Sequence, residues 1–203
     1  MKPICLIGYS GHSFVVADAT KTMGFRVSNY CDKKENLLNP LNLIFSGDEK
    51  EALKEGVFNN FHPVLGIGNN TLRANIANFF ILNKVSILTV LHQKAVIASS
   101  VEINEGSVVF AGAILNPFVT IGNGVICNSG CIIEHECKIG DFSHICPGAV
   151  LAGNVTVGKN VFIGANSVIR QGIVIGDNVV IGAGSVVVKN VNSGSVVYGV
   201  PAK

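Results

Sequence analysis

The chain has 203 residues, of which 48% are hydrophobic and 14% are charged, and its formal net charge is +2. This composition is typical of a folded protein of one or two domains and excludes a disordered chain. The small net charge, with no run of Lys or Arg, excludes a basic nucleic-acid surface. We therefore expect small molecules as partners.

The apolar run near the N-terminus is short. It covers residues 4–7 and ends at Gly8, which is too short for the core of a signal peptide. No later stretch approaches the roughly 20 apolar residues that a membrane span needs. Six cysteines without a signal peptide indicate free, mostly buried thiols in a reducing compartment. The expected location is the cytoplasm.

The first half of the chain alternates between strand-like and helix-like patterns. Strands are expected at 3–7, 26–30 and 64–67, and helices at 14–23, 48–55 and 71–82. This alternation predicts a small parallel sheet of Rossmann-like character, an α/β domain over residues 1–92.

The second half follows a six-residue repeat. From residue 97 to 192 it divides into sixteen consecutive blocks without insertion, each with an aliphatic first position except Cys127 and a small or β-branched fifth position. Three blocks close a triangular coil of eighteen residues, so the pattern predicts slightly more than five coils stacked about 4.8 Å apart. Glycine is frequent at the second position, where we expect it to relieve the backbone at the corners. Residues 93–203 are thus predicted to form an all-β parallel β-helix.

These blocks resemble the left-handed β-helix of the hexapeptide-repeat acyltransferases. Within that class, the run 132–144 with its Glu134-His135-Glu136 core is similar to the sugar O- and N-acyltransferases. That family includes sialic-acid O-acetyltransferases and the UDP-4-amino-sugar N-acetyltransferases of the bacillosamine pathway. The similarity also covers 8–12, Asp32, 67–73 and 199–203, whereas Ser13 and Cys31 depart from the pattern.

Histidine suits acetyl transfer because it titrates near neutral pH and can take a proton from the attacking amine or hydroxyl. His135 stands at an outward position of its block. The resemblance implies that His135 is the general base, that Glu136 orients it, and that Asn128 lies beside it in the substrate site. A zinc site built from His135 and Cys137 is excluded because Cys137 occupies an inward position, so we expect no metal.

The segment Gly8-Tyr-Ser-Gly-His12 lies between a predicted strand and a predicted helix, where backbone N–H groups can hold phosphate oxygens. The G-x-G-x-x-G spacing of a dinucleotide site is absent, which disfavours NAD. The resemblance implies a nucleotide-sugar pocket in this half of the chain. Its expected residues are Gly8, Ser10, Gly11, His12, Asp32, Gly68 and Asn69.

Acetyl-CoA is the co-substrate that the resemblance implies, bound along the outside of the later coils. The expected contacts are His144, Gly153, Gly172, Ala183 and Lys189, with Lys203 as an alternative near the phosphates. The relatives are trimers with active sites between neighbouring β-helices. His144 of one subunit is therefore expected near the acetyl group or the substrate beside His135 of another, and a surface or packing role for His144 is the alternative.

The predicted function is acetyl transfer from acetyl-CoA to the 4-amino group of a nucleotide-linked amino-sugar, for surface glycan or glycoprotein biosynthesis. UDP-4-amino-4,6-dideoxy-N-acetylglucosamine is the first candidate substrate. A sialic-acid O-acetyltransferase is one alternative, and a non-catalytic nucleotide-sugar-binding protein is another. Phosphate-type turns in the first half favour the nucleotide sugar.

Overall fold

The computed structural model describes residues 2–203, which form two compact units, one ending at Gln93 and the other spanning Lys94–Lys203. The first unit holds a parallel four-stranded sheet of order β3-β2-β1-β4. Its strands are β1 (Ile4–Ile7), β2 (Val27–Cys31), β3 (Ile44–Phe45) and β4 (His62–Leu65). Its helices are α1 (Gly11–Thr22), α2 (Glu49–Lys54), α3 (Val57–Asn60) and α4 (Asn70–Leu82), and β5 (Val90–Leu91) follows. The predicted α/β fold is confirmed, although β3, α3 and β5 were not expected.

Helix α1 begins three residues earlier than the sequence predicts, because two serines hold its first turn. The backbone N–H of Ser10 donates to Ser13 Oγ over 2.8 Å, and Ser13 Oγ donates to the carbonyl of Ser10 over 2.6 Å. Ser13 is fully buried, and a Cβ added to Gly66 would lie 2.6 Å from the Cβ of Ser13. The helix start therefore packs directly against the chain that leaves β4.

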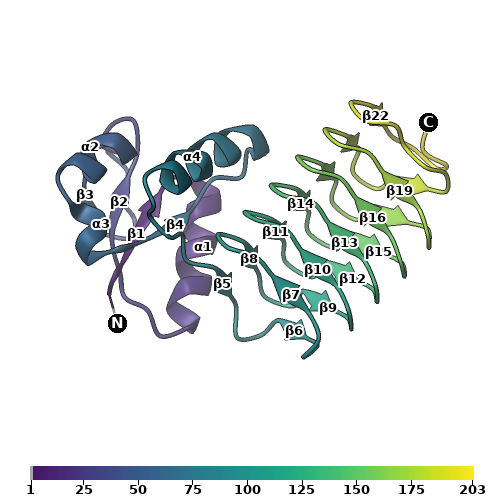
Figure 1. The fold of residues 1–203 in the computed structure, drawn as a ribbon, viewed down its shortest axis with the longest axis horizontal. Helices are drawn as coiled ribbons and strands as arrows, with labels where there is room; N and C mark the ends of the chain where they lie inside the picture. Colours follow the sequence, from purple (N-terminus) through teal and green to yellow (C-terminus); the bar gives the residue numbers. More distant parts are fainter. Residues whose placement is uncertain (1) are drawn as a thin grey trace. The chain divides into compact units, whose positions relative to one another are not determined.

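The second unit is a left-handed β-helix whose coils follow one another as successive steps in Figure 1. Its strands are β6 (Val96–Ile97), β7 (Glu102–Ile103), β8 (Val108–Val109), β9 (Ile114–Leu115), β10 (Thr120–Ile121), β11 (Ile126–Cys127), β12 (Ile132–Ile133), β13 (Lys138–Ile139), β14 (His144–Ile145), β15 (Val150–Leu151), β16 (Thr156–Val157), β17 (Phe162–Ile163), β18 (Val168–Ile169), β19 (Val174–Ile175), β20 (Val180–Ile181), β21 (Val186–Val187) and β22 (Val196–Val197). The predicted six-residue repeat is confirmed.

Three parallel sheets form the faces of this unit, and each is named here by its first strand. The β7 sheet runs β19-β16-β13-β10-β7, the β6 sheet runs β21-β18-β15-β12-β9-β6, and within this unit the β8 sheet runs β22-β20-β17-β14-β11-β8. Paired residues are eighteen apart, as in Ile121 and Ile139. The last pair, Val180 and Val196, is sixteen apart, so the final coil is two residues shorter.

The glycines at the second position of the blocks have a different role from the one that the sequence predicts. Positive φ angles fall at the fourth position of the blocks, as at Gly130 and Gly148, rather than at the second. The second-position glycines instead allow neighbouring coils to approach: a Cβ on Gly140 would lie 2.5 Å from the carbonyl carbon of Gly158. The expectation that these glycines relieve the corners is therefore wrong, and close stacking of the coils is the reason for their presence.

The inward positions fill the β-helix with apolar side chains. Ile133 and Cys137, the first and fifth residues of one block, are fully buried. All six cysteines of the chain are free and buried, as predicted. Since the interior is occupied by these side chains, chemistry on this unit takes place at its turns and outer faces.

Candidate active site

His135 and Glu136 form the turn that joins β12 to β13, at the edge between the β6 and β7 sheets. His135 Nδ1 lies 3.0 Å from Glu136 Oε2, and the two side chains are 52% and 62% exposed. A carboxylate only accepts hydrogen bonds, so in the neutral imidazole this contact favours the tautomer with the proton on Nδ1, which leaves a lone pair on Nε2 for a substrate proton. This geometry suits a general base with an orienting acid.

Glu136 adopts a left-handed backbone conformation, with φ of 62°. Glycine and asparagine take this conformation easily, whereas other side chains pay a steric cost. Strain of this kind is typical of functional positions, where a side chain is kept for what it contacts. At this position the contact is the carboxylate against the imidazole of His135.

Gly153 lies one coil beyond His135 and is packed against its ring. A Cβ on Gly153 would come within 2.6 Å of both Cε1 and Nε2 of His135. Gly153 is buried and has no positive φ, so its backbone conformation does not require glycine. The close approach of the His135 imidazole is the reason that a residue without a side chain stands there. The sequence predicts Gly153 as an acetyl-CoA contact but not this packing.

His144 belongs to β14 in the β8 sheet and is only 7% exposed. Its Nε2 lies 2.9 Å from Asn128 Nδ2, and its ring packs edge-to-face on Phe162 with centroids 5.3 Å apart. Asn128, expected beside His135, is therefore a hydrogen-bond partner of His144. The imidazole of His144 is held on a face of the β-helix that does not include the His135 turn.

The predicted acetyl-CoA residues fall at three places. Gly153, Gly172 and Lys189 lie in successive turns of the same edge as His135, and a Cβ on Gly172 would meet nothing within 4 Å. Ala183 is exposed in a turn of the edge between the β8 and β6 sheets. Since His144 lies on the β8 sheet, one chain alone does not gather these five residues.

Over residues 2–203, no cluster of three or more His, Cys, Asp or Glu side chains forms a candidate metal site. Cys137 points inward and its thiol donates to the carbonyl of Ala152 over 3.2 Å. His135, two residues earlier, is turned toward solvent. The two side chains therefore do not face a common ion.

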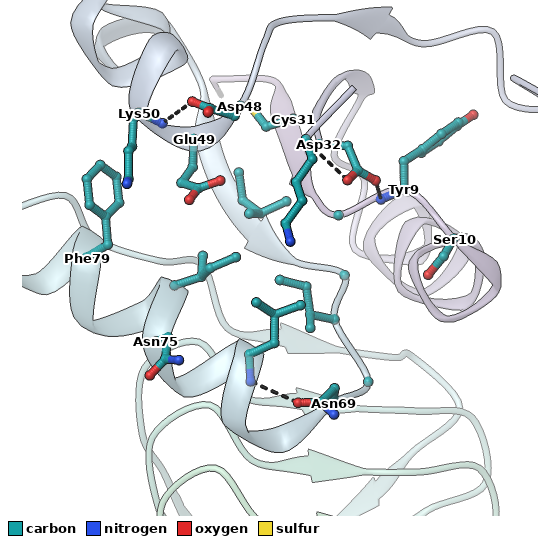
Figure 2. A pocket seen from close by; sticks show the side chains of 18 residues that line it. Tyr9, Ser10, Cys31, Asp32, Asp48, Glu49, Lys50, Asn69, Asn75 and Phe79 are labelled. Carbon is teal, nitrogen blue, oxygen red and sulfur yellow. Dashed lines mark hydrogen bonds between the residues drawn. The ribbon is translucent and has the colours of Figure 1, made fainter. Parts of the chain in front are cut away.

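The first unit contains a cavity of about 690 Å³ at the carboxyl ends of its strands, which are shown with their loops in Figure 2. Parallel strands end at the same edge of a sheet, so the turns after β1, β2, β3 and β4 meet there. Of the predicted substrate residues, Gly8, Ser10, Asp32, Gly68 and Asn69 line this cavity. Gly11 and His12 are not among its lining residues.

Asp32 connects two of these turns. Its Oδ2 accepts the N–H of Tyr9 over 2.9 Å, and its Oδ1 accepts the N–H of Lys33 over 2.7 Å. Tyr9 is further fixed by stacking on Tyr30, with ring centroids 4.1 Å apart. The carboxylate that the sequence predicts as a ligand for substrate thus also sets the shape of the Gly8–Ser10 turn.

A buried cation lies behind the turn that follows β4. Arg73 is 1% exposed, and its guanidinium donates to the carbonyls of Ile67 and Gly68. Burial lowers the pKa of Arg73 to about 9. Burial, with a smaller contribution from the positive charge of Arg73, lowers the pKa of His12 to about 4, so His12 is neutral at pH 7.

Several residues of the cavity were not predicted. Helix α2 contributes Glu49 and Lys50, and Figure 2 shows the carboxylate of Glu49 inside the cavity. Helix α4 contributes Leu72, Asn75, Ile76 and Phe79. The last four are spaced i, i+3, i+4 and i+7, the pattern of one helix face, which is a signal present in the sequence.

Two family models match the chain. Residues 3–80 match the model described as the PglD N-terminal domain, and residues 154–189 match the hexapeptide repeat of succinyl-transferase. Along residues 2–203, no helix is both long and apolar enough to cross a membrane.

Solved structures are similar over the whole chain. A variant of perosamine N-acetyltransferase from Caulobacter crescentus, in complex with CoA and GDP-perosamine, shares 30% identity with a TM-score of 0.95, covering 100% of this chain and 96% of that chain. The acetyltransferase domain of PglB from Neisseria gonorrhoeae shares 30% identity with a TM-score of 0.93, covering 100% and 99%. WeeI from Acinetobacter baumannii, at 24% identity and a TM-score of 0.79, shares the fold.

The β-helix, its turn histidine and these similarities define a hexapeptide-repeat acetyltransferase, for which acetyl-CoA is the co-substrate. Within that class, the chain belongs to the family of sugar O- and N-acyltransferases, and the similar Caulobacter protein is a perosamine N-acetyltransferase. The family resemblance stated from the sequence is thereby confirmed.

Proposed function

We propose that the protein transfers the acetyl group of acetyl-CoA to the 4-amino group of a nucleotide-linked amino-sugar, for surface glycan or glycoprotein biosynthesis. The observation that carries the proposal is the His135–Glu136 pair, with its 3.0 Å contact and its solvent-facing imidazole. The Caulobacter relative, solved with GDP-perosamine and CoA, supports an amino-sugar acceptor. Because acetyl-CoA and nucleotide sugars are cytoplasmic metabolites, we place the reaction in the cytoplasm.

In the proposed mechanism the sugar amine attacks the thioester carbonyl of acetyl-CoA. A bond forms between nitrogen and the carbonyl carbon, the carbon–sulfur bond breaks, and the CoA thiolate leaves. His135 Nε2 takes the proton that the amine loses, and this proton can then pass to the thiolate. Glu136 keeps Nδ1 protonated and stabilises the imidazolium that forms.

The first unit is proposed to bind the nucleotide. Its cavity has the volume of a small-molecule site and is lined by the turns that follow β1, β2 and β4. The N–H groups of Gly8, Tyr9 and Ser10 are bonded within the chain, so a diphosphate would be held by other groups of these turns. We propose Gly8, Ser10, Asp32, Gly68 and Asn69 as substrate contacts, with Gly11 and His12 behind them. A UDP-linked sugar is the first candidate because the sequence resembles the UDP-4-amino-sugar N-acetyltransferases of the bacillosamine pathway. A GDP-linked sugar is the second because of the Caulobacter complex.

A homotrimer with active sites between subunits is also proposed. The outward residues of the β8 sheet are apolar apart from His144, and those of the β6 sheet are apolar throughout, whereas the β7 sheet presents mostly polar residues such as Glu102, Thr120 and Lys138. Val168 on the β6 sheet and Val180 on the β8 sheet are 42% and 38% exposed. Two different apolar faces suit a heterologous contact that closes into a ring.

This contact would complete the active site. His135 lies at an edge of the β6 sheet and His144 lies on the β8 sheet. If the β8 sheet of one subunit packs on the β6 sheet of the next, His144 approaches the His135 edge of its neighbour. The acetyl-CoA contacts Gly153, Gly172 and Lys189 would then lie beside the partner's face, with Ala183 supplied from another edge.

The substrate test is acetyl transfer measured on a panel of 4-amino-sugars linked to UDP, GDP and dTDP, with sialic acid beside them. Transfer to at least one nucleotide amino-sugar, lost in His135→Ala, is expected. Transfer to sialic acid alone would establish the O-acetyltransferase alternative. Binding of nucleotide sugar without transfer to any acceptor would establish the non-catalytic alternative.

The assembly test is sedimentation of two lysine variants and a matched control. Val168→Lys and Val180→Lys should dissociate the trimer, while Val174→Lys, on the β7 sheet and 47% exposed, should leave it intact. A monomeric wild-type protein with full activity would refute the shared site. Mixed trimers of His135→Ala and His144→Ala chains should recover activity at the sites that combine two intact residues.

A further inference from the structure

Phe118 combines two unfavourable features. It has a φ of 64°, in the left-handed region, where a bulky residue is a genuine outlier, and its side chain is 69% exposed. Between residues 106 and 184, fourteen turn residues have positive φ, and glycine or asparagine fills eleven of them. The exceptions are Phe118, Glu136 and Phe142. The left-handed backbone opposes stability, and a mostly exposed ring gains little burial to offset that cost, so we look for a reason outside folding.

The other two exceptions have visible partners. The carboxylate of Glu136 contacts His135, as described above. The ring of Phe142 covers Gly124, since a Cβ on that glycine would lie 2.6 Å from its Cδ1 and Cε1. Phe142 is partly buried by this packing, whereas Phe118 remains mostly exposed. Packing within the chain therefore explains Phe142 but not Phe118.

The position of Phe118 is close to the catalytic turn. It stands eighteen residues before Glu136, in the preceding turn of the same edge. The two turns are hydrogen-bonded, because the N–H of Glu136 donates to the carbonyl of Pro117 over 3.1 Å. Neighbouring coils are about 4.8 Å apart, which is close to the width of one sugar ring. Gly153 lies one coil beyond His135 and packs on its ring, and on the preceding coil Pro117 stands at the position of His135, directly before Phe118.

We propose that Phe118 is a substrate-contact residue whose ring packs on the apolar C–H face of the acceptor amino-sugar, including the methyl group of a 6-deoxy sugar. This inference rests on the proposed function. With the amine directed at His135, a ring one coil away covers the neighbouring sugar carbons and removes them from water. A 6-deoxy sugar offers more apolar surface there than one with a 6-hydroxyl group, so Phe118 also acts in substrate selection.

The test compares Phe118→Asn with Phe142→Asn, because asparagine accepts the left-handed conformation at both turns. Phe118→Asn should raise the KM for the 6-deoxy amino-sugar nucleotide about tenfold, the usual effect of losing one apolar side-chain contact. Its KM for acetyl-CoA should stay unchanged and its Tm should stay equal or rise. Phe142→Asn should lower the Tm and leave the sugar KM unchanged. The increase for Phe118→Asn should be smaller on the 6-hydroxy analogue.

Two results would overturn the proposal. One is an unchanged sugar KM in Phe118→Asn while the wild-type enzyme acetylates the nucleotide sugar. The other is loss of the oligomer in sedimentation with unchanged kinetics per site, which would assign Phe118 to a contact with a second copy of the chain. If the wild-type enzyme acetylates no nucleotide amino-sugar, the proposed function itself fails, and this outcome is separate from the other two.

Discussion

Replacing Gly153 by alanine tests whether the imidazole of His135, the proposed general base, needs a bare backbone beside it. The new Cβ would lie 2.6 Å from Cε1 and Nε2 of His135, while ordinary contact begins at 3.4 Å. The ring must therefore move by about 0.8 Å or rotate away, which would also stretch its 3.0 Å contact with Glu136. A displacement of about 1 Å at a reacting group can cost about a hundredfold in rate. We expect kcat to fall by about that factor.

Stability should change little in Gly153→Ala, because alanine is accepted at the same position of other turns. Ala165 and Ala183 occupy it, and Gly153 has no positive φ that a side chain would strain. The assay is steady-state acetyl transfer with both KM values, together with thermal unfolding. Since the effect acts through His135, Gly153→Ala should add little to His135→Ala in a double variant. A kcat within twofold of wild type, or a full additional loss in the double variant, would refute this reasoning.

Three further predictions concern named side chains. His135→Ala should lower kcat at least about a hundredfold with unchanged acetyl-CoA binding, and Glu136→Gln should lower it less, as measured by turnover and calorimetry. Asp32→Ala should raise the KM for the nucleotide sugar and leave that for acetyl-CoA unchanged, because the carboxylate holds the N–H of Tyr9; equal changes in both constants would contradict this. Burial, and then the charge of Arg73, lower the pKa of His12 from 6.5 to about 4. Between pH 6.5 and pH 4 the unfolded chain therefore binds a proton on His12 that the folded chain does not bind. The free energy of unfolding should therefore fall by about 3 kcal/mol as the pH drops from 6.5 to 4, and this loss should disappear in His12→Gln, compared by denaturant titration at both pH values.

The β-helix could be predicted from the sequence because its pattern is local. Inward and outward positions recur every six residues, so the strands, the coil length and the outward direction of His135 follow from counting along the chain. The α/β alternation of the first half is also a local pattern, and its main strands and helices lie close to the predicted ranges. Short elements such as β3 (Ile44–Phe45) have too few residues to show a period.

The contacts between distant residues were decided by the tertiary structure. Coil stacking brings Gly153 onto His135 and Asn128 onto His144, and these pairs are eighteen and sixteen residues apart. Which side chain fills the space between two coils depends on rotamers that a repeat pattern does not specify.

The cavity of the first unit shows the same division. The sequence alone shows that glycine-rich turns follow the predicted strands, including Gly8 and Gly68. The sheet order β3-β2-β1-β4 then decided that Glu49 and Phe79, from two different helices, line the same cavity as those turns. A linear pattern fixes which residues are buried and which turn outward, because burial repeats along the chain. Only the packing of coils and strands fixes which outward residues meet, because that depends on pairings between segments far apart in the sequence.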